Sequence, residues 1–224
     1  MYKVKAVCFD DYLTLRFPVV EGLNIETELT NALRERFDLD DNFLELYRIE
    51  AMEAQNIRQI EMRETSLIEI TTRAMEQLGY DIASIENEVI ESVVDSTSKW
   101  KTSYYPDVFE TLEYFKKRGC RLGLITNTHW PYPEDVRERF CDFDVITISY
   151  EHGYVKPHPN IFQDTVDLLG VSPLDCVHVG DDPIADIQGA RDAGFKTVFI
   201  NRKNRGNIIS DYEIHHLCEL QQIL

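Results

Sequence analysis

The second half of the chain alternates regularly between short apolar runs and longer amphipathic segments. The alternation predicts helices over residues 107–118, 133–140, 159–169 and 183–193, and strands over residues 121–125, 144–148, 176–179 and 197–200. Gly119, Gly170 and Gly194 directly follow three of these helices, as is typical of helix C-termini. Strands connected by helices of this length form a parallel sheet with right-handed crossovers and helices on both faces. The pattern therefore predicts an α/β fold.

The first part of the chain has a different character. Residues 4–9 are mostly apolar and are followed directly by Asp10, which is typical of a short strand buried on both faces of a sheet. Residues 21–100 contain no proline, and apolar residues recur there at helical spacing. We therefore expect a helical block inserted after the first strand. The predicted division is a core domain of residues 1–15 and 101–224 and a helical domain of residues 16–100.

The charge balance limits the partners that the protein can bind. The chain has 23 Lys and Arg residues against 40 Asp and Glu residues, which gives a formal net charge of −17. A field of this sign repels nucleic acid and anionic membranes, so we expect neither as a partner. An anionic substrate would need local positive potential from a metal, a lysine or backbone N–H groups. The pattern carries no indication of the oligomeric state.

The cysteines and the N-terminal sequence indicate the compartment. The five cysteines are scattered and form no C-x-x-C pair, which argues against a disulfide framework and against a thiolate zinc site. The apolar run near the N-terminus is too short for a signal peptide or a membrane span. We therefore expect a cytoplasmic protein.

Polar side chains gather where the predicted strands end, which is where open parallel sheets bind their ligands. The carboxylates of Asp10, Asp181 and Asp182 offer the hard oxygen ligands that Mg²⁺ prefers. Such a cation, together with Lys156, would allow an anionic phosphoryl group to approach. The other polar residues at these ends are Asp11, Tyr12, Thr126, Asn127 and Asp186.

This set of residues predicts a specific chemistry. Asp10 would attack phosphorus in line and form an aspartyl-phosphate, while Thr126 and Asn127 hold the non-bridging oxygens. Catalysis would then depend mainly on positioning and on the stabilisation of charge. The substrate would be a small anionic molecule.

Four segments, in order along nearly the whole chain, resemble the motifs of the haloacid dehalogenase-like (HAD) superfamily. They are VCFDDYLT (7–14), LGLITN (122–127), GYVKPHP (153–159) and VGDDPIAD (179–186). The resemblance implies a Rossmann-like three-layer core with a mobile helical cap. It also implies these roles: Asp10 as nucleophile, Thr126 as phosphate-binding hydroxyl, Lys156 as the residue that steadies nucleophile and phosphoryl charge, Asp181 with Asp182 or Asp186 as metal-site residues, and the main-chain carbonyl of Tyr12 as a further Mg²⁺ ligand.

Tyr12 departs from the phosphatase pattern of this superfamily, which usually has a second Asp at this position as general acid and base. A phenol is a poor base at neutral pH, so an unactivated phosphate ester would react roughly 10²–10⁴ times more slowly. His129, which follows the second motif, is a possible replacement donor. Leu13 replaces the small or polar residue that often comes next, which narrows the turn.

The 2-haloacid dehalogenases of the superfamily have a Tyr at this position and use no metal. In this respect the chain resembles them. Those enzymes have uncharged residues where this chain has Asp181 and Pro183, and they have a Tyr where it has Phe162. The favoured interpretation is a Mg²⁺-dependent phosphatase of a small phosphorylated metabolite. A dehalogenase and a weakly catalytic binding protein remain as alternatives.

Two further groups of basic residues are expected to have no part in the chemistry. Arg202, Lys203 and Arg205 after the last strand of the alternating pattern are expected to form a solvated turn. The arginines of the helical block are expected on solvated helix faces, although one of them could reach an anionic substrate.

Overall fold

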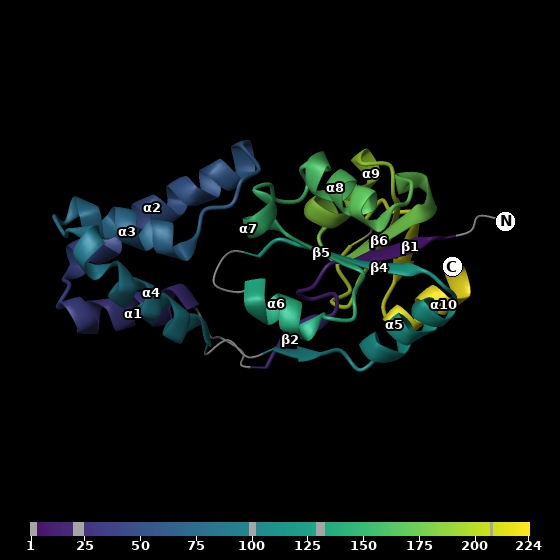
Figure 1. The fold of residues 1–224 in the computed structure, drawn as a ribbon, viewed down its shortest axis with the longest axis horizontal. Coiled ribbons are helices and arrows are strands. Elements are labelled where there is room, and N and C mark those ends of the chain that lie inside the picture. The colour runs from purple at the N-terminus through teal and green to yellow at the C-terminus, as the bar shows by residue number, and fades with distance from the viewer. Residues whose placement is uncertain (1–3, 20–24, 99–101, 129–132, 207) are drawn as a thin grey trace.

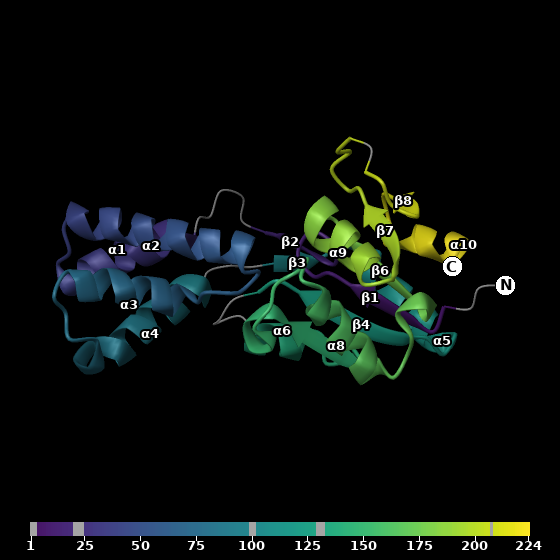
Figure 2. The ribbon, with the colours of Figure 1, turned by 90° about the horizontal axis from the view of Figure 1, so that it is seen from above.

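A computed structural model describes residues 4–19, 25–98, 102–128, 133–206 and 208–224. None of the helices in these ranges combines the length and the apolar character that crossing a membrane requires. The described residues form a sheet-containing core and a helical block that lies to one side of it (Figures 1 and 2).

In the described part of the chain, six strands form one parallel sheet in the order β5-β4-β1-β6-β7-β8. This confirms the predicted α/β class and the parallel pairing. The strands are β1 (Ala6–Phe9), β4 (Arg121–Thr126), β5 (Val145–Ile148), β6 (Cys176–Gly180), β7 (Lys196–Ile200) and β8 (Tyr212–Ile214). β8 was not predicted, because it is only three residues long and contains a charged residue.

Alternate residues of β1 face two different apolar layers, which is why the whole strand is hydrophobic. Val7 and Phe9 belong to the cluster that contains α5 (Val108–Lys117), α6 (Pro133–Arg139) and α10 (Leu220–Ile223). Ala6 and Cys8 belong to the cluster on the other face, with α8 (Pro159–Leu169) and α9 (Gly189–Asp192). The core therefore has three layers, as the resemblance implied.

Short elements complete the core. They are α7 (Ser149–His152), the 3₁₀ turns Pro173–Asp175 and Leu217–Glu219, and a π-helical turn Pro183–Gln188 that precedes α9. The sequence predicted one continuous helix over residues 183–193. The backbone is helical over this range, and its hydrogen bonding changes from π to α at Gly189, where an added Cβ would lie 2.8 Å from the Phe162 ring and from the Pro157 backbone. Glycine allows this close approach.

The helical block consists, where the structure describes it, of α1 (Ile25–Phe37), α2 (Asp41–Ile60), α3 (Leu67–Gln77) and α4 (Ile82–Ser98). The helices share a cluster of buried residues that is separate from the sheet, including Leu33, Phe43, Ala74 and Val93. The Asp40 carboxylate accepts from the backbone of Asn42 and caps α2, and the Ser66 hydroxyl caps α3 in the same way. Amphipathic spacing and caps therefore account for this block.

An unpredicted antiparallel ribbon joins the block to the core. β2 (Arg16–Pro18) pairs with β3 (Thr102–Tyr104), so that the two connections between the block and the core lie side by side. Each strand has only three residues, too few for a period-two pattern to stand out. β2 begins six residues after Asp10, which couples the ribbon to the turn that follows β1.

Candidate active site

The predicted site residues lie at one edge of the sheet. Asp10 follows β1, Thr126 ends β4, and Asp181 follows β6. Because these neighbouring strands are parallel, their carboxyl ends meet at the same edge. Lys156 reaches this edge from the loop between α7 and α8, and Asp186 from the π-helical turn.

Lys156 connects two of the carboxylates. Its Nζ lies 2.6 Å from Oδ1 of Asp10 and 2.6 Å from Oδ1 of Asp186, and the residue is 3% exposed. Burial disfavours the ammonium, but the negative charges of Asp10 and Asp186 raise the pKa of Lys156 above its ordinary value. Lys156 is therefore a fixed cation beside Asp10.

Asp186 accepts three hydrogen bonds. Besides Lys156, the donors are Nε2 of His178 at 3.1 Å and the backbone N–H of Asp182 at 3.0 Å. Burial would raise the pKa of Asp186, but Lys156 and the His178 hydrogen bond hold this pKa well below its usual range. An added Cβ at Gly180 would lie 2.2 Å from Cγ of Asp186, so the glycine makes room for this carboxylate.

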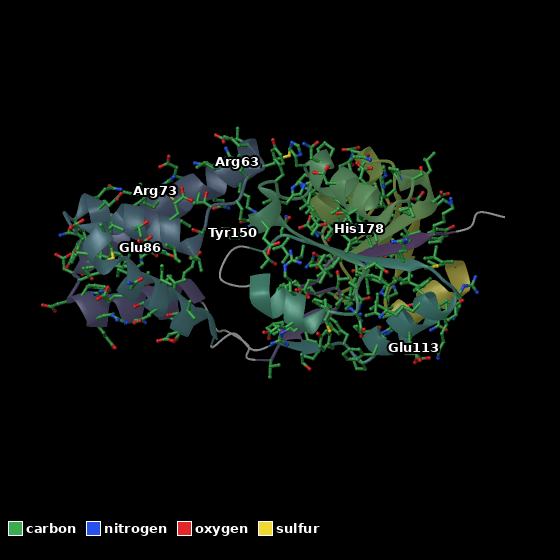
Figure 3. All side chains as sticks on the ribbon, viewed as in Figure 1. Arg63, Arg73, Glu86, Glu113, Tyr150 and His178 are labelled. Carbon is green, nitrogen blue, oxygen red and sulfur yellow. The ribbon has the colours of Figure 1, made fainter. Side chains whose placement is uncertain are left out.

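His178 was missed in the sequence. It lies in the middle of β6 among apolar neighbours and is completely buried in the core (Figure 3). Burial lowers the pKa of His178, so the neutral ring can donate its Nε2–H to Asp186. A buried polar side chain needs a hydrogen-bond partner. A histidine inside an otherwise apolar strand, two residues before Gly180, was the signal that could have found it.

Asp10, Asp181 and Asp186 each offer a carboxylate oxygen, and these oxygens lie within 4.8 Å of one another. Burial raises the pKa of Asp10 well above its usual value. The charge of Lys156 lowers this pKa, and the charges of Asp186 and Asp181 raise it further. Burial and the charge of Asp186 raise the pKa of Asp181 to about 6. The three carboxylates therefore carry more negative charge than Lys156 neutralises. Such a group of oxygen ligands fits a hard divalent cation.

Asp182, predicted as a further metal-site residue, lies outside this group of three carboxylates. It is exposed, and its Oδ1 accepts from the backbone N–H groups of Ile184 and Ala185 at 2.8 and 2.7 Å. The side chain thus caps the π-helical turn. The local turn geometry, which the sequence did not reveal, directs this carboxylate to backbone donors.

Thr126 and Asn127 lie at the predicted place but differ in what they contact. Thr126 is 2% exposed, with its Oγ1 3.1 Å from Oγ1 of Thr128. The Asn127 amide binds the backbone of Lys156 at both ends, donating to its carbonyl at 3.0 Å and accepting from its N–H at 2.7 Å. Asn127 therefore positions Lys156, a role that the sequence did not suggest.

The turn after Asp10 contains both residues that depart from the phosphatase pattern. Tyr12 is 36% exposed, and burial of the rest of its ring, followed by the effects of Tyr105 and Asp181, raises the pKa of its phenol. The hydroxyl therefore stays protonated at neutral pH. Leu13 adopts a left-handed conformation with φ of 64°. The main-chain carbonyl of Tyr12 as a Mg²⁺ ligand stays a prediction, and His129 lies outside the described residues.

The basic residues after β7 lie in a turn that is exposed at Lys203 and Arg205, as expected, but Arg202 and Arg205 also bind acidic residues, which was not expected. The Arg202 side chain is 9% exposed, forms an ion pair with Asp107 at 3.0 Å, and lies over the Tyr105 ring at 3.7 Å from its centroid. Arg205 lies 3.3 Å from Oδ2 of Asp181 and donates to the Asp181 carbonyl at 3.2 Å. Long-range pairing with acidic residues, which spacing alone does not reveal, holds these two side chains.

A cavity of about 1050 Å³ lies between the core and the helical block. Lys156 and Asn127 line it on the core side, and α2 lines it on the other side. The loop between α2 and α3 contacts the core at two points. The Met62 carbonyl accepts from the Val155 N–H at 2.8 Å, and Oε2 of Glu64 accepts from the Ser149 hydroxyl at 2.7 Å. The C-terminal end of α2 accordingly points toward α7 (Figure 1).

Comparisons with known proteins agree with this architecture. The chain is 41% identical over 116 residues to an N-acylneuraminate-9-phosphatase of Mus musculus, a match that covers 48% of this chain and 47% of the mouse protein. It is 32% identical over 157 residues to a glyceraldehyde 3-phosphate phosphatase of Methanopyrus kandleri, which covers 63% of this chain and 66% of that protein. The matched part therefore spans from about half to two thirds of these relatives.

Several solved structures match nearly the whole chain. Among them is a 2-haloacid dehalogenase from Pseudomonas syringae pv. tomato, with a TM-score of 0.76 and 25% identity, and the match covers 98% of this chain and 97% of that one. The family model for haloacid dehalogenase-like hydrolases matches residues 4–194. The chain therefore belongs to the haloacid dehalogenase-like hydrolase family.

Proposed function

We propose that this protein is a Mg²⁺-dependent phosphatase that hydrolyses a small phosphorylated metabolite through an aspartyl-phosphate on Asp10. The observation that carries the proposal is the buried contact of Lys156 with Asp10, beside two more carboxylates, Asp181 and Asp186, whose oxygens lie within 4.8 Å of Asp10. The curated relatives named above, both phosphatases, support it. We also infer a cytoplasmic location from the unpaired cysteines.

The reaction follows from the residues around Asp10. A carboxylate oxygen of Asp10 attacks phosphorus, the bond between phosphorus and the leaving oxygen breaks, and an acyl phosphate forms. Lys156 stabilises the charge on the phosphoryl oxygens, and the Thr126 hydroxyl binds one of them. Water then attacks the acyl phosphate, which releases inorganic phosphate and restores Asp10.

Asp10, Asp181 and Asp186 would hold the Mg²⁺ ion. When bound, the ion supplies a positive charge that neutralises the carboxylates and the phosphoryl oxygens. Asp186, with both oxygens already engaged, also keeps Lys156 in place. Because Tyr12 is a weak acid, the leaving oxygen receives little help, so good leaving groups react best.

The helical block serves as the cap in this proposal. Residues 1–15 and 101–224 act as the core, and residues 16–100 cover the cavity from which Lys156 is reached. The contacts of Met62 and Glu64 with the core hold the cap over the site. Substrate selection would then depend on the side chains that α2 presents to the cavity.

Hydrolysis of p-nitrophenyl phosphate tests the proposal, since this leaving group needs no general acid. We expect turnover that requires Mg²⁺, is abolished in Asp10→Asn and is retained in Asp182→Asn, where the amide oxygen still caps the π-helical turn. In Tyr12→Asp, turnover of alkyl phosphates should rise, because the missing acid and base is restored. Absence of Mg²⁺-dependent hydrolysis in the unsubstituted protein would refute the proposal.

The second candidate is a 2-haloacid dehalogenase, which Tyr12 and the Pseudomonas structure favour. Against it, Phe162 is fully buried and packs edge-on against His178 with ring centroids 5.3 Å apart, in the region where the dehalogenases carry a tyrosine. Metal-independent release of chloride from 2-chloropropionate would establish this alternative in place of the phosphatase.

A further inference from the structure

Arg58 is held at the core end of the cavity. It lies in the last turn of α2 and lines the cavity, and its Nη1 is 3.2 Å from Oε1 of Glu64. The other oxygen of Glu64 accepts from Ser149, which is fully buried in α7 at the edge of the core. Since the Glu64 side chain is only 5% exposed, this pair is partly shielded from water. Arg58 is therefore fixed with respect to the core.

Two other cations line the described part of the cavity, and neither is as well placed. Lys156 is already bound to Asp10 and Asp186. Arg48 lies ten residues before Arg58 on the same helix, which is about 15 Å away along the helix axis at 1.5 Å per residue. Of the two α2 cations that line the cavity, Arg58 is thus the one next to the loop that contacts the core.

Arg58 retains capacity to bind a ligand. A guanidinium has five N–H donors, and in the described residues one of them, on Nη1, contacts Glu64. Next to Arg58 on the cavity wall, α2 contributes the neutral polar side chains of Gln55 and Gln59. A planar carboxylate matches the remaining donors of a guanidinium and accepts two parallel hydrogen bonds.

The size of the cavity agrees with such a ligand, and the charge of the protein makes a local cation necessary. The volume of about 1050 Å³ is far more than a phosphate group needs and lies just above the range of small-molecule sites, about 300–1,000 Å³. With a formal charge of −17, the protein as a whole repels a second anionic group. A local cation is therefore needed where such a group binds.

We propose that Arg58 binds a carboxylate on the leaving-group part of the substrate, so that the preferred substrates are phosphate monoesters of small hydroxy acids or sugar acids. Glu64 is the positioning residue, which orients Arg58 and at the same time holds the cap loop on Ser149. This inference rests on the proposed phosphatase function and specifies its substrate class.

Matched pairs of esters test it. 3-Phosphoglycerate is compared with glycerol 3-phosphate, and 6-phosphogluconate with glucitol 6-phosphate, so that each pair differs only by a carboxylate in place of a hydroxymethyl group. In at least one pair, kcat/KM should be about tenfold or more higher for the acid, as a charge-assisted hydrogen-bond pair provides. In Arg58→Gln this preference should disappear, mainly through a higher KM for the acid.

Control variants separate the contact from a general charge effect. Arg48→Gln removes the same charge from the same helix and should leave the preference for the acid unchanged. Arg58→Lys should restore part of it. Glu64→Gln keeps an acceptor for Ser149 but loses the ion pair with Arg58, so the ratio of kcat/KM for the acid to kcat/KM for the matched neutral ester should fall in this variant.

The outcomes are distinguishable from failure of the proposed function. Hydrolysis of p-nitrophenyl phosphate without a preference for either acid would overturn the role of Arg58 and leave the phosphatase proposal intact. An equal loss for acids and neutral esters in Arg58→Gln would overturn it as well. If no ester is hydrolysed, calorimetric titration with the same four esters measures the contact directly, and equal affinity of Arg58→Gln and the unsubstituted protein for the acids refutes it.

Discussion

At the residue scale, Leu13 has the backbone conformation that a β-carbon disfavours. Its φ of 64° lies in the left-handed region, three residues after Asp10, and its N–H donates to the Arg16 carbonyl at 2.6 Å. A non-glycine residue in this region costs roughly 1–2 kcal/mol. The tight turn directly after the proposed nucleophile is therefore strained at Leu13. Glycine at this position would adopt the same conformation without this cost.

This strain predicts the order of stability of two variants. Leu13→Gly and Leu13→Ala lose nearly the same side chain, but only Leu13→Ala keeps the β-carbon. We expect Leu13→Gly to be more stable than Leu13→Ala by about 1 kcal/mol in urea unfolding. Equal stabilities, or a more stable Leu13→Ala, would show that the turn is not strained at this position.

The raised pKa of Asp181 also has a consequence for stability. The pKa rises from 3.8 to about 6 on folding, so the stability associated with this carboxyl is fully present below about pH 4 and is lost as the pH rises through about 6. At pH 7.5 and without metal, Asp181→Asn should therefore stabilise the protein by about 1–3 kcal/mol.

Urea unfolding in the presence of a chelator measures this gain. The difference between Asp181→Asn and the unsubstituted protein should shrink when the pH is lowered from 7.5 to 5. Asp182→Asn serves as the control, because it removes the same charge from the adjacent, exposed residue. A destabilising effect of Asp181→Asn at pH 7.5 would mean that the ion pair with Arg205 outweighs the cost of burying the carboxylate.

At the scale of elements, the ribbon of β2 and β3 is tied to the turn after β1 by a buried ion pair. Arg16 binds Asp11 through two parallel hydrogen bonds, one of them 2.6 Å between Nε and Oδ1, and its Nη1 donates to Thr102 of β3 at 3.1 Å. The two side chains of the pair are 8% and 2% exposed. One arginine therefore links both strands of the ribbon to the residue next to Asp10.

Because the pair is buried, its parts should not act independently. We expect Arg16→Met alone to destabilise the protein by roughly 3–5 kcal/mol, since it leaves the Asp11 carboxylate buried without a counter-charge. The double variant with Asp11→Leu should recover much of this loss. Additive effects of the two substitutions in a double-mutant cycle, measured by urea unfolding, would contradict a coupled pair.

At the scale of the whole molecule, the net charge and the local site act in opposite directions on an anionic substrate. The formal charge of −17 repels it at long range, whereas Lys156 and Arg58 attract it at short range. Dissolved salt screens the long-range interaction far more than the interaction inside a buried site. Substrate capture should therefore improve when salt is added.

Raising the salt concentration from about 20 to about 200 mM shortens the screening length from roughly 20 Å to roughly 7 Å. We expect KM for p-nitrophenyl phosphate to fall about twofold or more while kcat stays constant. Steady-state kinetics in sodium chloride and in choline chloride separate screening from specific ion effects. A KM that rises with salt would show that the local cations dominate the approach of the substrate.

The sequence by itself determined the α/β class, the parallel sheet and the position of the candidate site residues at the strand ends. These depend on local signals: strand-length apolar runs, helical spacing, and the polar side chains that follow each strand, such as Asp10, Thr126 and Asp181. Parallel pairing then brings the strand ends together, whatever the details of the loops. The grouping of Asp10, Asp181 and Asp186 follows from this rule.

Only the tertiary structure decided what each of these side chains contacts. Asn127 binds the Lys156 backbone and Asp182 caps a turn, because loop geometry places backbone groups next to them. The partnership of Glu64 with Ser149 spans 85 residues of sequence. Hydrogen bonds and ion pairs of this kind require donor and acceptor atoms to be placed to within a few tenths of an ångström. The segments that carry these atoms come together only in the folded chain, and no periodicity or spacing in the sequence encodes their positions.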